Sequence, residues 1–153
     1  LKPPQKRDHK IDNPDIDLFV VQGAEHARHV LEKTDVDLLF GVEDHERGDP
    51  MFARSSGINH ILAKIAHDRE KILGLSFSSL LTAKKRRRTV LMGRMKQNVI
   101  LCKKYKVHMV FASFACVPCH MRSGHDLMSL GISLGMTPGQ AKNAVHLLDK
   151  RLC

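Results

Sequence analysis

Residues 72–114 read ILGLSFSSLLTAKKRRRTVLMGRMKQNVILCKKYKVHMVFASF, with a long basic segment between two apolar ones. Ile72–Phe77 and Val107–Phe114 are short apolar runs whose length predicts buried strands. Between them, the apolar side chains of residues 84–105 fall on one stripe of a helical wheel, about 100° wide. These side chains are Leu91, Met92, Met95, Val99 and Cys102. Strand, helix and strand in this order predict two parallel strands joined by a crossover helix.

The segments outside this stretch extend the same alternation. Ile16–Val21 and Val36–Val42 are further apolar runs that predict strands. The remaining periodic segments predict helices at Ala24–Lys33, Ile58–Glu70, His125–Leu134 and Pro138–Leu152. The alternation predicts the α/β class with a parallel sheet. Periodicity does not distinguish part of a TIM-barrel-like sheet from a small open sheet.

The length of 153 residues suits one domain, expected over residues 16–153 after an irregular lead-in at residues 1–15. The chain begins with Leu1 rather than Met, which indicates a processed chain or a fragment. Its sequence contains neither an apolar run of membrane-spanning length nor a secretory signal. We therefore expect a cytoplasmic protein with reduced cysteines and no membrane partner.

The basic residues gather in one part of the chain. The formal net charge is +9, and residues 71–125 hold 12 Lys or Arg and no Asp or Glu. Surfaces that serve solubility usually mix both signs, so this cationic run indicates contact with a polyanion. Aromatic residues make up only 5% of the chain, which argues against an interface built mainly on base stacking.

On the predicted helix 84–105, cations surround the apolar stripe. They lie on both flanks and on the outer face: Lys85, Lys96, Lys103, Arg87, Arg94, Arg86 and Lys104. Neighbouring like charges destabilise a helix unless an anion compensates them, and guanidinium groups suit bidentate phosphate contacts. A solvated helix face and a nuclear-localisation tag are the alternatives. Gly93 costs the helix about 1 kcal/mol relative to Ala, which predicts a close contact at that position.

The sequence Cys116-Val-Pro-Cys119-His120 matches the C-x-x-C-H pattern of c-type haem attachment. The same residues offer half of a zinc site or a redox pair. A haem site requires export and an axial ligand, and no second ligand pair completes a zinc site in the sequence. We favour two small thiols packed at a turn, and keep Cys116, Cys119 and His120 as weak metal-ligand candidates.

Acidic residues near the predicted strands suggest a second alternative. Glu43-Asp44-His45 follow the predicted strand Val36–Val42, and active sites of α/β barrels lie at the carboxyl ends of strands. Neither a His-x-His nor a paired-carboxylate signature supports them. A metal-dependent hydrolase with an amidohydrolase-like barrel is the alternative function.

Three segments resemble the family of archaeal ribonuclease P protein component 3. They are RSSGINHILAKIAHDREKILGLSFSSLL (54–81), KKRRRTVLMGRMKQNVILCKKYKVHMVFAS (84–113) and MRSGHDLMSLGISLGMTP (121–138). The matching features are an Arg before Gly-hydrophobic-Asn, an Arg-rich helix start, a Lys-Tyr-x-Val strand entry and an Arg-Ser turn, in family order. The resemblance extends from about residue 16 to residue 152.

This resemblance implies a TIM-barrel-like fold and a subunit that supports a catalytic RNA, with its Mg²⁺ ions, in removing the 5′ leader of precursor tRNA. It also implies a second ribonuclease P protein subunit as partner, in a heterotetramer. Catalysis would belong to the RNA, so we expect neither a catalytic residue nor a cofactor in this chain. The helix geometry and the resemblance together predict an RNA-binding set of Arg86, Arg87, Arg88, Arg94, Lys85, Lys96, Arg122 and Arg54. The resemblance also implies an RNA contact at Asn59.

Two features depart from the family. Its opening strands and helices, before the equivalent of Ile16, are absent or replaced by LKPPQKRDHKIDNPD. A barrel without them exposes a sheet edge, so we expect a fragment or a barrel that a partner closes. The sequence CVPCH occupies a turn to which the family gives no role.

Overall fold

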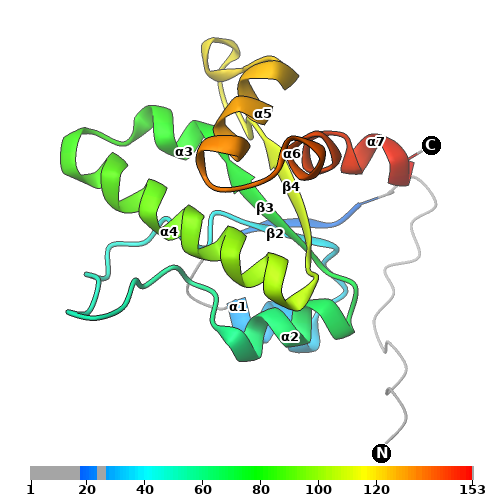
Figure 1. The fold of residues 1–153 in the computed structure, drawn as a ribbon. Coiled ribbons are helices and arrows are strands. Elements are labelled where there is room, and N and C mark those ends of the chain that lie inside the picture. Colours follow the sequence, from blue (N-terminus) through cyan, green and yellow to red (C-terminus); the bar gives the residue numbers. More distant parts are fainter. Residues whose placement is uncertain (1–17, 24–26, 153) are drawn as a thin grey trace, which may run out of the picture.

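The computed structural model describes residues 18–23 and 27–152. These residues form a parallel sheet with helices between its strands (Figure 1). The strands are β1 (Val20–Gln22), β2 (Leu38–Phe40), β3 (Ile72–Ser76) and β4 (His108–Ala112). The helices are α1 (Ala27–Lys33), α2 (His60–Asp68), α3 (Phe77–Thr82), α4 (Lys85–Tyr105), α5 (Gly124–Ser133), α6 (Pro138–Val145) and α7 (Leu147–Leu152). A 3₁₀ turn, η1 (Pro118–His120), precedes α5.

The four described strands lie side by side in chain order, and each neighbouring pair is parallel. Leu38 of β2 is in register with Val20 of β1 and with Ile72 of β3, which is in register with His108 of β4. The predicted α/β alternation is confirmed. Within the described residues the sheet is open, with β1 and β4 at its two edges, which fits the expected barrel-like sheet without its first strands.

The two faces of the sheet have different coverings. Alternate strand residues point toward α1, α2, α4, α5 and α6 and are buried there: Leu39, Leu73, Leu75 and Phe111. The opposite face carries Leu38, Ile72 and Val110, which pack with Leu147 and Leu148 of α7. The helix-covered face therefore holds most of the described core.

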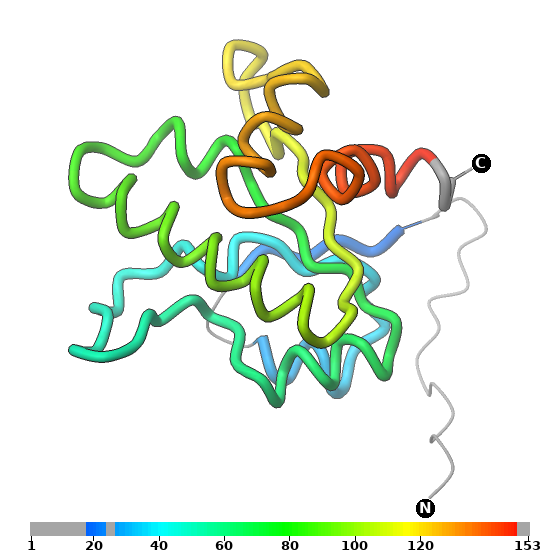
Figure 2. Tube along the Cα trace, viewed as in Figure 1, coloured from blue at the N-terminus to red at the C-terminus, as the bar shows by residue number. Residues whose placement is uncertain are grey.

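Helix α4 crosses the helix-covered face and buries Leu91, Met95, Val99 and Cys102 (Figures 1 and 2). The loop between β2 and α2 runs out beside the first half of α4, as the tube in Figure 2 shows. Among the described residues, no helix combines the length and apolar character that a membrane span requires. The fold thus places a long loop against the most basic helix.

Several element boundaries differ from those predicted. The predicted strand Ile16–Val21 and helix Ala24–Lys33 lie partly outside the described residues. Helix α3 was not predicted: it begins directly after β3, where Ser76 Oγ accepts a hydrogen bond from the Ser79 N–H. The single predicted helix Pro138–Leu152 is two helices, α6 and α7, with His146 between them.

Candidate nucleic-acid interface

The first turn of α4 presents cations to solvent. Lys84, Lys85 and Arg86 are exposed, and the turn contains no acidic residue. Among the described residues, no partner binds the side chains of Lys85, Arg86 or Lys96. Because the N-terminus of a helix carries partial positive charge, cations there are unfavourable unless an anion compensates them. The start of α4 is therefore suited to receive phosphate.

Arg87 connects α4 to the loop that follows β2. Its Nη2 lies 2.7 Å from Asp44 Oδ1, and 47% of its side chain is exposed. These two residues, with Lys84 and residues of α3, line a cavity of about 430 Å³. Exposed ion pairs of this kind contribute little to stability, so a phosphate can compete with Asp44 for this guanidinium.

Arg88 is exposed, and its guanidinium also donates to backbone carbonyls of the protein. Its Nε donates to the carbonyls of Leu80 and Ala83, at 3.0 and 3.1 Å, and its Nη2 donates to the carbonyl of Leu81 at 3.3 Å. These carbonyls end α3, where the helix leaves acceptors unpaired and carries partial negative charge. The guanidinium of Arg88 thus caps α3, and its contact with RNA stays a prediction.

The expected RNA contact of Arg94 is corrected, because its side chain is buried at 3% relative exposure. Its Nε lies 2.8 Å from Asp49 Oδ1, and its Nη1 donates to the carbonyls of Glu43 and His45, each at 3.0 Å. Its Nη2 donates to the Arg47 carbonyl. Burial raises the pKa of Asp49, but the hydrogen bonds from Ser55 N–H and Arg94 outweigh it and hold that pKa below its usual range. Arg94 therefore fixes the loop after β2 to α4.

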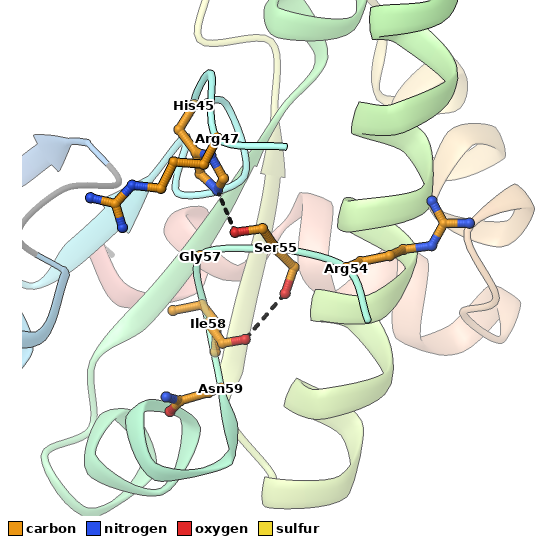
Figure 3. Close-up of a pocket in the computed structure, with 8 residues that line it drawn as sticks. His45, Arg47, Arg54, Ser55, Gly57, Ile58 and Asn59 are labelled. Atoms are coloured by element: carbon orange, nitrogen blue, oxygen red, sulfur yellow. Dashed lines mark hydrogen bonds between the residues drawn. The ribbon is translucent and has the colours of Figure 1, made fainter. Parts of the chain in front are cut away.

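The side chain of Arg54 extends outward across α4 (Figure 3), and its guanidinium lies at Gly93. A Cβ at position 93 would overlap the Arg54 guanidinium. Gln97 Nε2 also donates to the Arg54 carbonyl at 3.3 Å. The close contact predicted at Gly93 is confirmed, and Arg54 is exposed above the same helix.

Arg122 lies beyond the carboxyl end of β4, in the turn before α5, where its N–H donates to Ser113 Oγ at 2.9 Å. Its Nη1 donates to the carbonyls of Cys119 and Met121, at 2.9 and 2.7 Å, and its guanidinium carbon lies 5.6 Å from the centre of the Phe77 ring. The side chain of Asn59 also has a local role, because its Oδ1 caps α2 by accepting from the Leu62 N–H at 2.9 Å. Both residues have structural partners already.

The C-x-x-C-H segment forms the exposed turn η1. Cys116 and Cys119 are exposed free thiols, and His120 Nδ1 lies 3.4 Å from Ser78 Oγ. Within the described residues, His, Cys, Asp and Glu form no group of three that could hold a metal ion. The two thiols lie at a turn, as expected, but they are exposed to solvent and do not pack against the core.

A pocket of about 270 Å³ lies between the loop and the N-terminus of α2 (Figure 3). His45 Nε2 and Ser55 Oγ meet there at 3.4 Å. Burial lowers the pKa of His45, and the neighbouring Arg94 lowers it further. The basic residues at its rim point away from it, because Arg47 and Arg54 extend in opposite directions in Figure 3. The pocket is therefore poorly arranged for charge-assisted ligand binding.

Glu43, next to this pocket in the sequence, is fully buried. Neither oxygen of its carboxyl group has a hydrogen-bond partner among the described residues. Burial raises its pKa from 4.5 to about 7, the nearby Asp44 raises it as well, and the Arg94 guanidinium lowers it. The sequence placed Glu43 in a polar loop and gave no sign of this burial.

Comparison with known proteins identifies the family. The sequence model of the family described as RNase P subunit p30 matches residues 7–152. Ribonuclease P protein component 3 of Methanosarcina acetivorans is 30% identical over 139 residues, 90% of this chain and 55% of the relative. That of Thermococcus kodakarensis is 30% identical over 152 residues, 99% of this chain and 66% of the relative. The chain thus spans about half the length of the first of these relatives.

A solved structure agrees with these sequence comparisons. A chain in the cryo-EM structure of archaeal ribonuclease P with mature tRNA superposes with a TM-score of 0.74 and 25% identity. The superposition covers 88% of this chain and 56% of that one. These likenesses support the ribonuclease P assignment over a metal-dependent hydrolase. Family match, fold and order of motifs agree, and the chain belongs to the RNase P subunit p30 family.

Proposed function

We propose that this chain binds ribonuclease P RNA through the basic face of α4 and so supports the RNA in removing the 5′ leader of precursor tRNA. The observation that carries the proposal is the set of exposed cations without partners at Lys85, Arg86 and Lys96, on a segment with no carboxylate from residue 71 to residue 125. Arg87 and Arg54 extend this surface toward the loop after β2.

The surface acts by neutralising phosphates. Each Lys or Arg that contacts a phosphate releases condensed counterions, which favours binding and makes it depend on salt. Such contacts position the RNA and do not read its sequence. Catalysis and its Mg²⁺ ions then belong to the RNA, and this chain is a subunit of the enzyme without catalytic residues of its own.

The wider assembly is part of the same proposal. We infer a second ribonuclease P protein subunit as partner, in a heterotetramer, with precursor tRNA reached through the RNA. The similar solved chain belongs to archaeal ribonuclease P with mature tRNA, which supports a place for this chain in a complex of that kind. The cytoplasmic location stays a prediction from the sequence.

Replacing the unpartnered cations is expected to weaken RNA binding in a salt-dependent way. The variant Lys85→Ala, Arg86→Ala, Lys96→Ala should make the negative slope of log K against log salt shallower by about 2 to 3, since each lost phosphate contact removes roughly 0.7 to 0.9 from its magnitude. The measurement is equilibrium binding to the ribonuclease P RNA of Methanosarcina acetivorans across a salt series.

A variant with the same loss of charge provides the control. Lys33, Lys64 and Lys142 are exposed on other helices, and their triple replacement by Ala should leave the slope close to that of the wild type. Equal slopes in both triple variants would show that α4 responds only to net charge and would contradict the proposed surface. Failure of the wild type to bind at low salt would contradict the function.

A further inference from the structure

The loop between β2 and α2 carries the two most exposed large apolar side chains of the described residues. Met51 is 91% exposed and Phe52 is 95% exposed. They lie in a turn in which the Ala53 N–H donates to the Pro50 carbonyl at 3.4 Å. An apolar patch that remains in water on a soluble protein often marks a contact surface. This one is small and lies at the tip of the loop.

The base of this loop is fixed on both sides of the tip. On the side before the tip, Arg94 binds three loop carbonyls and the Asp49 carboxylate. On the side after it, Asn98 Nδ2 donates to the Ser56 carbonyl at 3.0 Å, and Gln97 binds the Arg54 carbonyl. All three anchoring side chains come from α4. These contacts therefore fix the position of the tip beside the basic helix α4.

The charges that remain free around the tip are mostly positive. Two of the loop's acidic residues are already paired: Asp44 with Arg87, and Asp49 with Arg94. Glu43 is buried, which leaves Glu46 as the one exposed, unpaired carboxylate of residues 43–56. Arg47 and Arg54 are exposed and extend on opposite sides of the loop (Figure 3).

An exposed aromatic ring, on a loop that also carries two exposed arginines, suits an unpaired nucleotide. The base can stack on the ring, as bases do on aromatic side chains in single-stranded RNA recognition, while arginines bind the adjoining phosphates. An apolar pocket of a protein would accept Phe52 and Met51 but would leave both arginines without acidic partners. Charge complementarity therefore favours RNA.

We propose that the tip at Pro50–Ala53 binds an unpaired nucleotide of the RNA, with its base stacked on Phe52 and its flanking phosphates at Arg47 and Arg54. This inference rests on the proposed function, because it assigns a second, base-stacking contact to the same RNA-binding protein. The low aromatic content excludes an interface built mainly on stacking, but it does not exclude a single stacked base.

Fluorescence provides a direct test, because the chain contains no Trp. In the variant Phe52→Trp, the only indole should be quenched when the protein binds the ribonuclease P RNA of Methanosarcina acetivorans, because a stacked base quenches it. A fully paired RNA duplex, which offers no unpaired base, should leave the emission close to that of the free protein. Binding of the ribonuclease P RNA without quenching would overturn the inference.

Affinity gives an independent result. Phe52→Ala should weaken binding about 5- to 150-fold, the effect of losing one base–aromatic stack, with the salt slope unchanged. Phe52→Trp should retain affinity, and Ile132→Ala, at an exposed apolar position on α5, should bind as the wild type does. Equal affinity of Phe52→Ala and the wild type would overturn this inference alone, and would leave the tip to a protein partner. A wild type that binds no RNA would overturn the proposed function as well.

Discussion

Arg94→Ala is expected to lower the free energy of unfolding by about 3 kcal/mol, within the range seen when one partner of a buried charged pair is removed. The guanidinium binds Asp49 and the carbonyls of Glu43, His45 and Arg47. Without it, these groups lose their charge-assisted hydrogen bonds, and the loop loses its attachment to α4. Urea denaturation followed by circular dichroism measures the change.

The comparison variants separate this role from a simple loss of charge. Lys96→Ala removes an exposed cation from the same helix and should change the stability by less than about 0.5 kcal/mol. Arg94→Lys should restore little, because an ammonium group lacks the planar fork that serves several acceptors at once. Limited proteolysis should cut residues 43–56 faster in Arg94→Ala. A variant as stable and as resistant as the wild type would show that this guanidinium does not hold the loop.

The sheet and the long helix were predictable because their signals are local. The apolar runs at Ile72–Phe77 and Val107–Phe114, and the apolar stripe of residues 84–105, each depend on residues close together in the chain. Helix α3 was missed because FSSLLT continues the apolar character of β3. Its signal was Ser76, a side chain that often caps a helix N-terminus.

The site was less predictable because it depends on contacts distant in the sequence. A helical wheel places Arg94 on the flank of α4, but it cannot show that residues 43–49 fold over that flank and bury it. Arg88 is similar, since its position on the exposed side of α4 gives no sign that its side chain reaches back to α3. Phe52 lies in the turn-rich segment GDPMFARSS (48–56). The composition of this segment predicts a loop, but it does not predict that side chains of α4 hold the loop in place. Only Gly93 gave a local signal of a long-range contact, through the unfavourable glycine within a helix.

Glu43 is expected to make the protein less stable as the pH rises from about 4.5 to about 7. Its folded-state pKa, about 7, lies above the value of 4.5 for a free carboxyl group. The group therefore contributes stability that is fully present below pH 4.5, declines as the pH rises and is lost above pH 7. The shift corresponds to about 3 kcal/mol, a large share of the stability of a small domain.

The measurement is a series of urea denaturation curves between pH 4.5 and pH 8 for the wild type and Glu43→Gln. Other groups also titrate in this range. The lowered pKa of His45 acts in the opposite sense, because its contribution falls as the pH falls. Glu43→Gln keeps those groups and removes only this carboxyl, so its stability relative to the wild type should rise by about 3 kcal/mol across the series. Glu46→Gln replaces an exposed carboxyl of the same loop, and its difference from the wild type should stay nearly constant. A constant difference for Glu43→Gln would mean that the buried carboxyl group ionises as readily in the folded chain as in the unfolded one.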